Sequence, residues 1–193
     1  FAQIKLTMGR GEEASQWARK ALEVDPNSAE AHVVVSSLYY LRGRFEKALD
    51  HAKKAVHGNP LLPKPYYVIG EIYLRNGRHE DGLKVLQHAA ALDPKDAAIQ
   101  NLLSSAYLKL DRYEEALEHA KIALEIDPNR PGAHFNIATA YYHSKNAQKA
   151  LDHARLALKL YKEQEMQQWT LKSKQLVDLI TKKFKMRPKD VAG

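Results

Sequence analysis

The same corner of sequence returns every 34 residues along this chain of 193 residues. An Asp-Pro or Asn-Pro pair marks that corner at positions 25–26, 59–60, 93–94 and 127–128. Because proline lacks an N–H and disfavours helical geometry in the residue before it, each pair predicts a break between helices. Self-similarity at a fixed interval of this length is typical of stacked repeat architectures.

A second break falls midway between the prolines, with RGR at 42–44, NGR at 76–78, LDR at 110–112 and SKN at 144–146. Between the breaks, apolar residues recur at steps of three and four, as in Val35, Leu38 and Tyr39, and again in Ala48 and Ala52. Such spacing lines one face of a helix. Each unit is therefore predicted to be a hairpin of two helices, which buries its apolar face only by stacking on its neighbours.

At these positions the chain resembles the tetratricopeptide repeat family, whose pattern asks for Leu-Gly and Tyr, then Ala, an aromatic, Ala and Pro. One repeat here reads Ile69, Gly70, Tyr73, Gly82, Leu86, Ala89 and Pro94. The chain departs from the pattern elsewhere: the aromatic is Ala52, Ala120 or Ala154, and the first-helix Trp is His32, Tyr66, Gln100 or His134. The resemblance covers roughly residues 1 to 162. It implies an all-α fold: a right-handed superhelical solenoid of stacked helix-turn-helix repeats with a C-terminal capping helix.

Counting in register gives the expected organisation of what would be one solenoid domain. We expect a partial first repeat over 1–28, repeats over 29–62, 63–96, 97–130 and 131–162, a basic amphipathic capping helix over 163–187 and a tail over 188–193. Counting back one period places Phe1 in the middle of a first helix, so we expect the native polypeptide to continue upstream. The open partial repeat exposes an unpaired apolar side, which makes self-association an expected alternative.

The segment after residue 162 breaks the period. Its apolar residues Trp169, Leu176, Val177, Ile180 and Phe184 fall on one helical stripe, as a helix that caps the last repeat requires. An alternative is an amphipathic helix that also docks on a partner or an anionic membrane.

The positive charge is concentrated in this same C-terminal part. The net charge is +7, and residues 129–193 hold 13 Lys and Arg against 5 Asp and Glu. Such a cluster can be a solvated helix face, or it can attract phosphates and acidic partners. No nucleic-acid-binding motif accompanies it, so nucleic acid is not the expected partner. The predicted basic patch is Lys172, Lys174, Lys182, Lys183, Lys185 and Arg187.

Nothing in the sequence favours catalysis, and we expect neither an enzyme nor a metal or cofactor site. The absence of cysteine excludes disulfides, thiol catalysis and thiolate ligands. His51, His119 and His153 share one repeat column, which predicts a spacing of ~10 Å and suits half-buried packing better than metal binding. No run approaches the ~18 apolar residues of a membrane span. The default expectation is a cytoplasmic protein, with a periplasmic or membrane-peripheral place left open.

The resemblance implies a binding surface, because first helices of this family line a concave groove with their second, fifth, ninth and twelfth positions. Carried over position by position, the candidate peptide-binding residues are Val33, Ser37, Tyr40, Lys64, Tyr67, Glu71, Leu74, Asn101, Ser105, Leu108, Phe135, Thr139 and Tyr142. The aromatic members are of the kind that anchor interfaces, although each could instead pack against the neighbouring repeat. The Lys and Asn set with which some members grip a C-terminal carboxylate is not reproduced in any frame.

We therefore expect a protein–protein interaction scaffold that binds an extended or helical segment of a partner in its groove. Two alternatives stay open: the non-catalytic arm of a larger enzyme or secretion machine, and an adaptor for anionic surfaces that works through the basic C-terminal helix.

Overall fold

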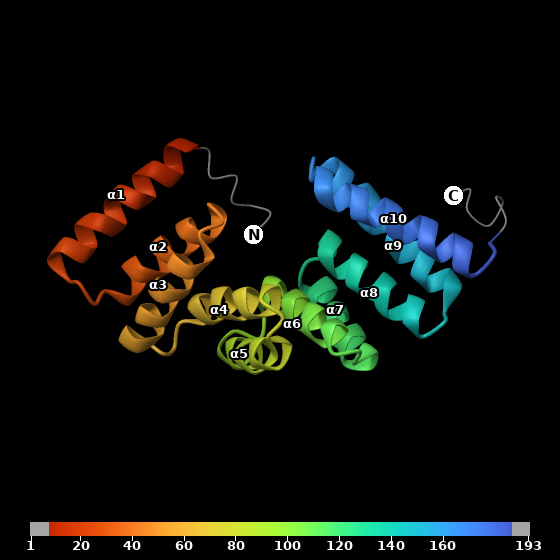
Figure 1. The fold of residues 1–193 in the computed structure, drawn as a ribbon, viewed down its shortest axis with the longest axis horizontal. Helices are drawn as coiled ribbons and strands as arrows, with labels where there is room; N and C mark the ends of the chain where they lie inside the picture. Colours follow the sequence, from red (N-terminus) through yellow and green to blue (C-terminus); the bar gives the residue numbers. More distant parts are fainter. Residues whose placement is uncertain (1–7, 187–193) are drawn as a thin grey trace. The chain divides into compact units, whose positions relative to one another are not determined.

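The computed structural model describes residues 8–186, and over this range it confirms the all-α prediction with ten helices and no strand. The helices are α1 (Met8–Val24), α2 (Ala29–Leu41), α3 (Phe45–Gly58), α4 (Pro63–Arg75), α5 (His79–Leu92), α6 (Ala97–Lys109), α7 (Tyr113–Ile126), α8 (Pro131–His143), α9 (Ala147–Glu163) and α10 (Gln167–Lys183), as Figure 1 shows. Arg187 of the predicted basic patch lies outside the described residues. Over 8–186, no helix combines the length and apolar character that a bilayer span requires.

The helices fall into two compact units, one ending at Pro94 and the other beginning at Lys95. In the first unit, α2 pairs with α3 and α4 with α5; α1 packs on α2, and α3 packs on α4. In the second unit, α6 pairs with α7 and α8 with α9, α7 packs on α8, and α10 packs on α9. The first helices also lie side by side within a unit, α2 beside α4 and α6 beside α8. Each unit is thus built from the predicted hairpins.

Every turn inside a hairpin contains one residue with a left-handed backbone. The turns close with a hydrogen bond from the residue after it to the carbonyl five positions back, as from Arg44 to Tyr39 at 2.9 Å. Glycine adopts this geometry without strain, which explains the RGR and NGR breaks. The left-handed residues are Gly43 (φ 71°), Gly77 (φ 76°), Asp111 (φ 56°) and Lys145 (φ 60°).

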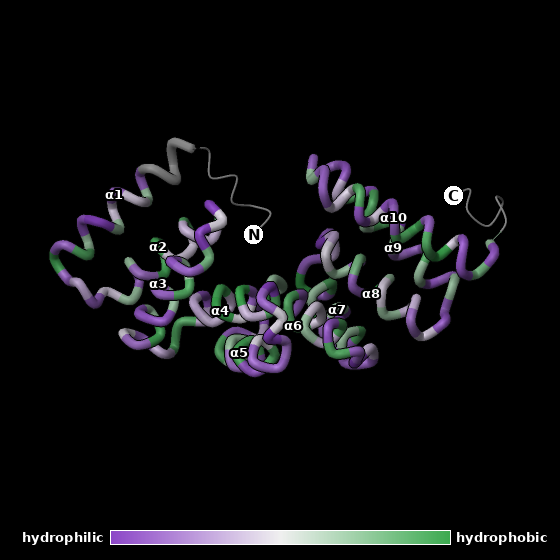
Figure 2. The backbone as a smooth tube through the Cα atoms, in the orientation of Figure 1, coloured by the Kyte–Doolittle hydropathy of each residue, from purple (hydrophilic) through white to green (hydrophobic). Residues whose placement is uncertain are grey.

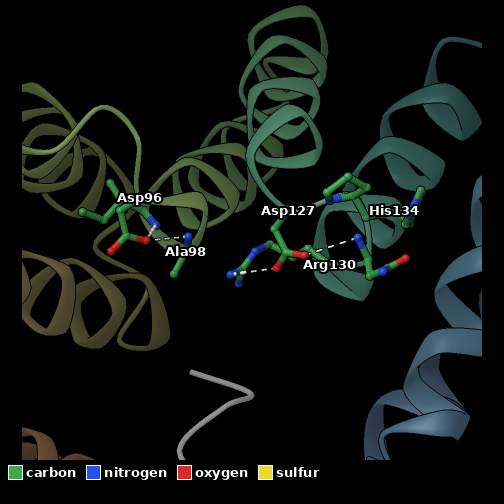
Figure 3. A network of polar contacts seen from close by, with 8 residues as sticks. Asp96, Ala98, Asp127, Arg130 and His134 are labelled. Atoms are coloured by element: carbon green, nitrogen blue, oxygen red, sulfur yellow. Dashed lines mark hydrogen bonds and ion pairs between the residues drawn. The ribbon is translucent and has the colours of Figure 1, made fainter.

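The Asp-Pro corner also has a specific geometry. The Asp127 side chain accepts a hydrogen bond from the Asn129 N–H at 3.3 Å and forms an ion pair with Arg130 at 3.3 Å (Figure 3). The helix cap itself comes later in the corner: in the preceding repeat, Asp96 accepts hydrogen bonds from the N–H groups of Ala98 at 2.7 Å and Ile99 at 3.2 Å. The Asp or Asn before proline therefore shapes the turn, and three positions on Ser28 and Asp96 cap the next helix, whereas Leu62 and Arg130 at the same place make no side-chain cap.

Small residues form the contact between the two helices of a hairpin. Alanines of the second helices have no exposed surface, namely Ala48, Ala52, Ala55, Ala89, Ala116, Ala120, Ala123, Ala150, Ala154 and Ala157. Figure 2 shows hydrophobic and hydrophilic segments alternating along the helices, as this one-sided burial requires. Because the alanine side chains at this contact are small, the backbones of the two helices can approach closely.

The hairpin of α4 and α5 fills the contact between its two helices with side chains of different size. Where the other hairpins carry Ala52, Ala120 or Ala154, this one carries Leu86, which is fully buried. The first helix compensates with Gly70, since a Cβ there would lie 2.5 Å from Leu86 Cγ. At the same position, Ser36 and Ser104 donate to second-helix carbonyls at 2.8 and 2.7 Å. Gly70 with Leu86, a serine with an alanine, and Ala138 with Ala154 in the hairpin of α8 and α9 are thus three fillings of one space.

The last helix covers the end of the second unit with its apolar stripe. Leu176 and Ile180 are buried, and Val177 and Phe184 pack against the same cluster. Trp169, predicted on this stripe, keeps 38% of its surface exposed. At the other end of the chain, α1 leaves Trp17 72% exposed at the position where α3 carries His51.

Candidate functional site

In the first unit, two of the predicted residues meet across neighbouring first helices. The hydroxyl of Tyr40 on α2 donates a hydrogen bond to the carboxylate of Glu71 on α4, 31 residues further along the chain. The edge of the Tyr40 ring packs on Phe45 at 5.5 Å between centroids, and the Arg75 guanidinium lies 4.3 Å from the Phe45 centroid. Burial, followed by the charge of Glu71, raises the pKa of the Tyr40 phenol well above its ordinary range, so the phenol stays a donor.

The other candidates of the first unit differ in exposure. Lys64 is exposed, and Val33 and Tyr67 are half-buried. Leu74 is only 9% exposed and lies where a Cβ on Gly82 would come within 2.9 Å of it, so it offers a ligand little surface. Tyr40 and Glu71, in contrast, both keep part of their surface exposed.

In the second unit, a residue that was not predicted joins the candidates. The Asn136 amide on α8 donates to the Asn101 carbonyl at 3.0 Å, the Asn101 side-chain oxygen at 3.2 Å and Ser105 Oγ at 2.9 Å. Gly132 permits this approach, since a Cβ there would lie 3.0 Å from the Asn101 amide nitrogen. Asn136 is 6% exposed, and its column is otherwise Val34, Val68 and Leu102, so a lone polar residue in an apolar column was the available signal.

The two aromatic candidates of α8 are partly covered by α10. Phe135 packs edge-on against Trp169 at 5.8 Å, and Tyr142 packs against Phe184 at 6.0 Å. The Lys183 ammonium lies 3.8 Å from the Tyr142 centroid, within reach of a cation–π interaction. Both rings remain half-buried, as does Leu108 on α6. These aromatics thus contribute to packing as well as to the predicted face.

The hydroxyl candidates occupy one repeat column, and each already uses its proton. Ser37 donates to the Val33 carbonyl at 2.9 Å, Ser105 to Asn101 at 3.2 Å and Thr139 to Phe135 at 2.9 Å. A hydroxyl whose hydrogen is engaged can still accept through its lone pairs. The fourth member of the column is the Glu71 carboxylate, which also accepts. The column therefore presents hydrogen-bond acceptors.

The histidines pair within hairpins. His32 Nδ1 lies 3.0 Å from His51 Nδ1, and His134 Nδ1 lies 3.0 Å from His153 Nδ1. In each pair the first-helix ring also binds a corner carbonyl through Nε2, that of Pro26 at 3.1 Å or Pro128 at 3.2 Å. Since a carbonyl only accepts, this Nε2 carries the proton, and the Nδ1–H of the second-helix ring donates across the hairpin.

The repeat column shared by His51, His119 and His153 did not predict these contacts, because they join residues 19 positions apart and not one period apart. Burial lowers the pKa of His51, His134 and His153 below the ordinary histidine value. Over the range searched within 8–186, no group of three or more His, Cys, Asp or Glu side chains is placed to hold a metal ion.

Comparison with known proteins gives matches along most of the chain. A tetratricopeptide repeat model matches residues 67–131 and a second one matches residues 107–174. A model of anaphase-promoting complex, cyclosome, subunit 3 matches residues 8–89. No curated protein matches the chain.

Several solved structures share the fold. MamA is 23% identical with a TM-score of 0.67, and the match covers 86% of this chain and 97% of that chain. YrrB, described as a TPR protein with an unusual peptide-binding site, is 22% identical with a TM-score of 0.65, covering 90% and 88%. PilF of Pseudomonas aeruginosa is 20% identical with a TM-score of 0.68, covering 98% and 91%. Together with the hairpins and their small-residue contacts, these matches show that the chain belongs to the tetratricopeptide repeat family, an all-α repeat solenoid.

Proposed function

We propose that this protein is an interaction scaffold that binds a segment of a partner protein across the first helices of a unit. The observation that carries the proposal is convergence: Tyr40 meets Glu71 across α2 and α4, and Asn136 meets Asn101 and Ser105 across α6 and α8. Side chains held by such bonds are already ordered, which lowers the entropy lost on binding. The peptide-binding site named for YrrB, which has the same fold, supports this proposal.

The chemistry of the faces favours a particular kind of ligand. A column of acceptors, Ser37 and Glu71 in one unit and Ser105 and Thr139 in the other, suits a segment that offers N–H groups, as the backbone of an extended peptide does. Half-buried rings beside it supply apolar area. Affinity would come from ring burial, and orientation from the acceptors.

Acid–base catalysis is not part of this proposal. The side chains with an ordinary pKa closest to neutrality are histidines, and His32 and His134 use both ring nitrogens to hold their own hairpin together. These rings therefore serve the structure.

The test uses peptides selected from a random library on the full chain, with affinity measured by calorimetry. Arginine introduced at Ser37 or Thr139 blocks the acceptor column of one unit, and we expect selected peptides to lose at least about tenfold in affinity for one of the two variants. Gln16→Arg, on the exposed side of α1, is the matched control. Equal affinity for wild type, Ser37→Arg and Thr139→Arg would show that the peptides bind elsewhere and would overturn the proposal.

A further inference from the structure

The terminal helix α10 has two chemically different faces. Ser173, Leu176 and Ile180 are buried against the rest of the second unit. On the other side the helix and the turn that follows it carry a set of exposed lysines, Lys172, Lys174, Lys182, Lys183 and Lys185. The buried face holds the helix in the unit, whereas the lysine side is exposed and accessible to a binding partner.

Large apolar side chains lie among these lysines. Leu171 is 57% exposed and Leu179 is 48% exposed. At 3.6 residues per turn, Leu179 lies about 80° around the helix from Leu171, with Lys182 about 20° from Leu171 and therefore between them. We call the exposed lysines together with Leu171 and Leu179 the lysine–leucine face.

The charge on this face is almost unopposed. The helix sequence contains no arginine and one acidic residue, the exposed Asp178, which lies about 20° from Leu171, so the face holds five lysines against one carboxylate. Two of the ammonium groups lie over aromatic rings, Lys172 at 4.3 Å from Trp169 and Lys183 at 3.8 Å from Tyr142. None of the ion pairs formed among residues 13–186 involves a lysine of α10. The face is thus positively charged and ordered at both ends.

We propose that the lysine–leucine face docks on an anionic lipid membrane, with α10 lying in the plane of the interface. Interfacial helices combine lysines, which bind acidic headgroups, with apolar side chains that enter the acyl boundary. Lysine stems also reach from an apolar layer to the headgroups. Neither leucine gains from a purely ionic contact, and nucleic-acid and phosphate binding usually uses arginine forks that this helix lacks. Charge complementarity together with the leucines therefore favours lipid.

This surface lies on α10 and leaves the acceptor columns of α2, α4, α6 and α8 untouched. The face does include Lys183, which lies over the Tyr142 ring, but the substitutions tested below leave Lys183 in place, so failure of membrane docking and failure of the proposed peptide binding remain distinguishable.

The experiment is co-sedimentation of the full chain with vesicles of phosphatidylcholine alone or with about 30% phosphatidylserine. We expect binding to the anionic vesicles only, weakening as salt rises. Each lysine near such a surface contributes about fivefold to partitioning, so Lys174→Gln with Lys182→Gln should lower it on the order of 25-fold. Leu171→Gln with Leu179→Gln should also weaken binding. Lys53→Gln with Lys84→Gln, which removes two exposed lysines of α3 and α5, should leave it unchanged.

A second readout separates insertion from simple charge attraction. The chain has no cysteine, so Leu179→Cys gives a single attachment point for an environment-sensitive fluorophore on the lysine–leucine face itself. A blue shift with phosphatidylserine vesicles is expected. The proposal is overturned if the chain binds phosphatidylcholine vesicles equally well, or if the leucine variant binds like wild type. It is also overturned if the control pair weakens binding as much as the α10 pair, or if the chain binds polyglutamate or RNA but does not sediment with vesicles.

Discussion

The hairpin of α4 and α5 offers a sharp test of how these repeats pack. In this hairpin Gly70 leaves room for Leu86, whereas in two other hairpins Ser36 or Ser104 stands opposite an alanine. A serine at position 70 would put its Cβ at 2.5, 2.7 and 3.2 Å from three Leu86 atoms, closer than packed atoms tolerate. Overpacking of this kind costs about 1–3 kcal/mol, which exceeds the few tenths gained in helix propensity over glycine.

The sign of that effect should reverse when the leucine is removed. Leu86→Ala alone leaves a cavity and costs about 2–5 kcal/mol. With Leu86→Ala in place, Gly70→Ser fills part of the cavity and can donate to the Gly82 carbonyl, as Ser104 donates to Ala116 at 2.7 Å, which is worth about 1 kcal/mol. We therefore expect Gly70→Ser to destabilise the wild type and to stabilise the Leu86→Ala variant.

The assay is urea unfolding followed by circular dichroism for wild type, both single variants and the double variant. Ser104→Gly, which removes the same serine from a hairpin that has alanine opposite, is the matched control and should destabilise by about 1 kcal/mol. The coupling energy between positions 70 and 86 should reach about 2 kcal/mol or more. If Gly70→Ser has the same effect in both backgrounds, the two side chains do not share one space and the reasoning is refuted.

Three further predictions concern the polar contacts. Because the folded-state pKa values of His134 and His153 are lowered, the unfolded chain takes up protons first, so the stability that these rings contribute should be complete above about pH 6.5 and should decline as the pH falls below it. His134→Gln copies the Gln100–His119 contact and should reduce the loss of unfolding free energy between about pH 7.5 and about pH 5.5, measured by denaturation at both values. An equal loss in the variant and the wild type would contradict the assignment. Tyr40→Phe removes the donor to Glu71 and should cost about 1 kcal/mol or more by thermal unfolding, whereas no loss would mean that the contact is not formed in solution. Asn136→Ala, which leaves the Asn101 oxygen without its partner, should cost about 1–3 kcal/mol, and a neutral result would contradict the described network.

The sequence predicted the features that depend on period alone. Breaks at a fixed spacing give the number and order of helices, and the alanine columns identify the hairpin contact. Gly43 and Gly77 mark turns that require a left-handed backbone, a requirement local enough to be visible in a tripeptide. The register of the repeats also places Tyr40 and Glu71 at predicted groove positions of neighbouring first helices, where their side chains meet.

Contacts that depend on the crossing of two helices could not be predicted in this way. His32 faces His51 because the hairpin folds back 19 residues later, whereas the sequence pattern drew attention to histidines one period apart. Asn136 was missed because its column is apolar in the other repeats, and only the approach allowed by Gly132 brings it to Asn101. The sequence also could not predict how exposed each groove position is. Leu74 and Tyr67 both occupy groove positions by register, yet Leu74 is buried against its own hairpin whereas Tyr67 is half-buried.

The paired imidazoles are distributed unevenly among the hairpins. They join α2 to α3 and α8 to α9, while α4 and α5 are joined at the corresponding place by Tyr66, whose ring packs on His88 at 4.5 Å. In each pair, a second proton on the first-helix ring would sit on Nδ1, because its Nε2 already carries one, and would place two N–H groups head to head. Mild acidity should therefore loosen particular hairpins while leaving others closed, so that amide exchange would rise in patches along the chain long before any global melting.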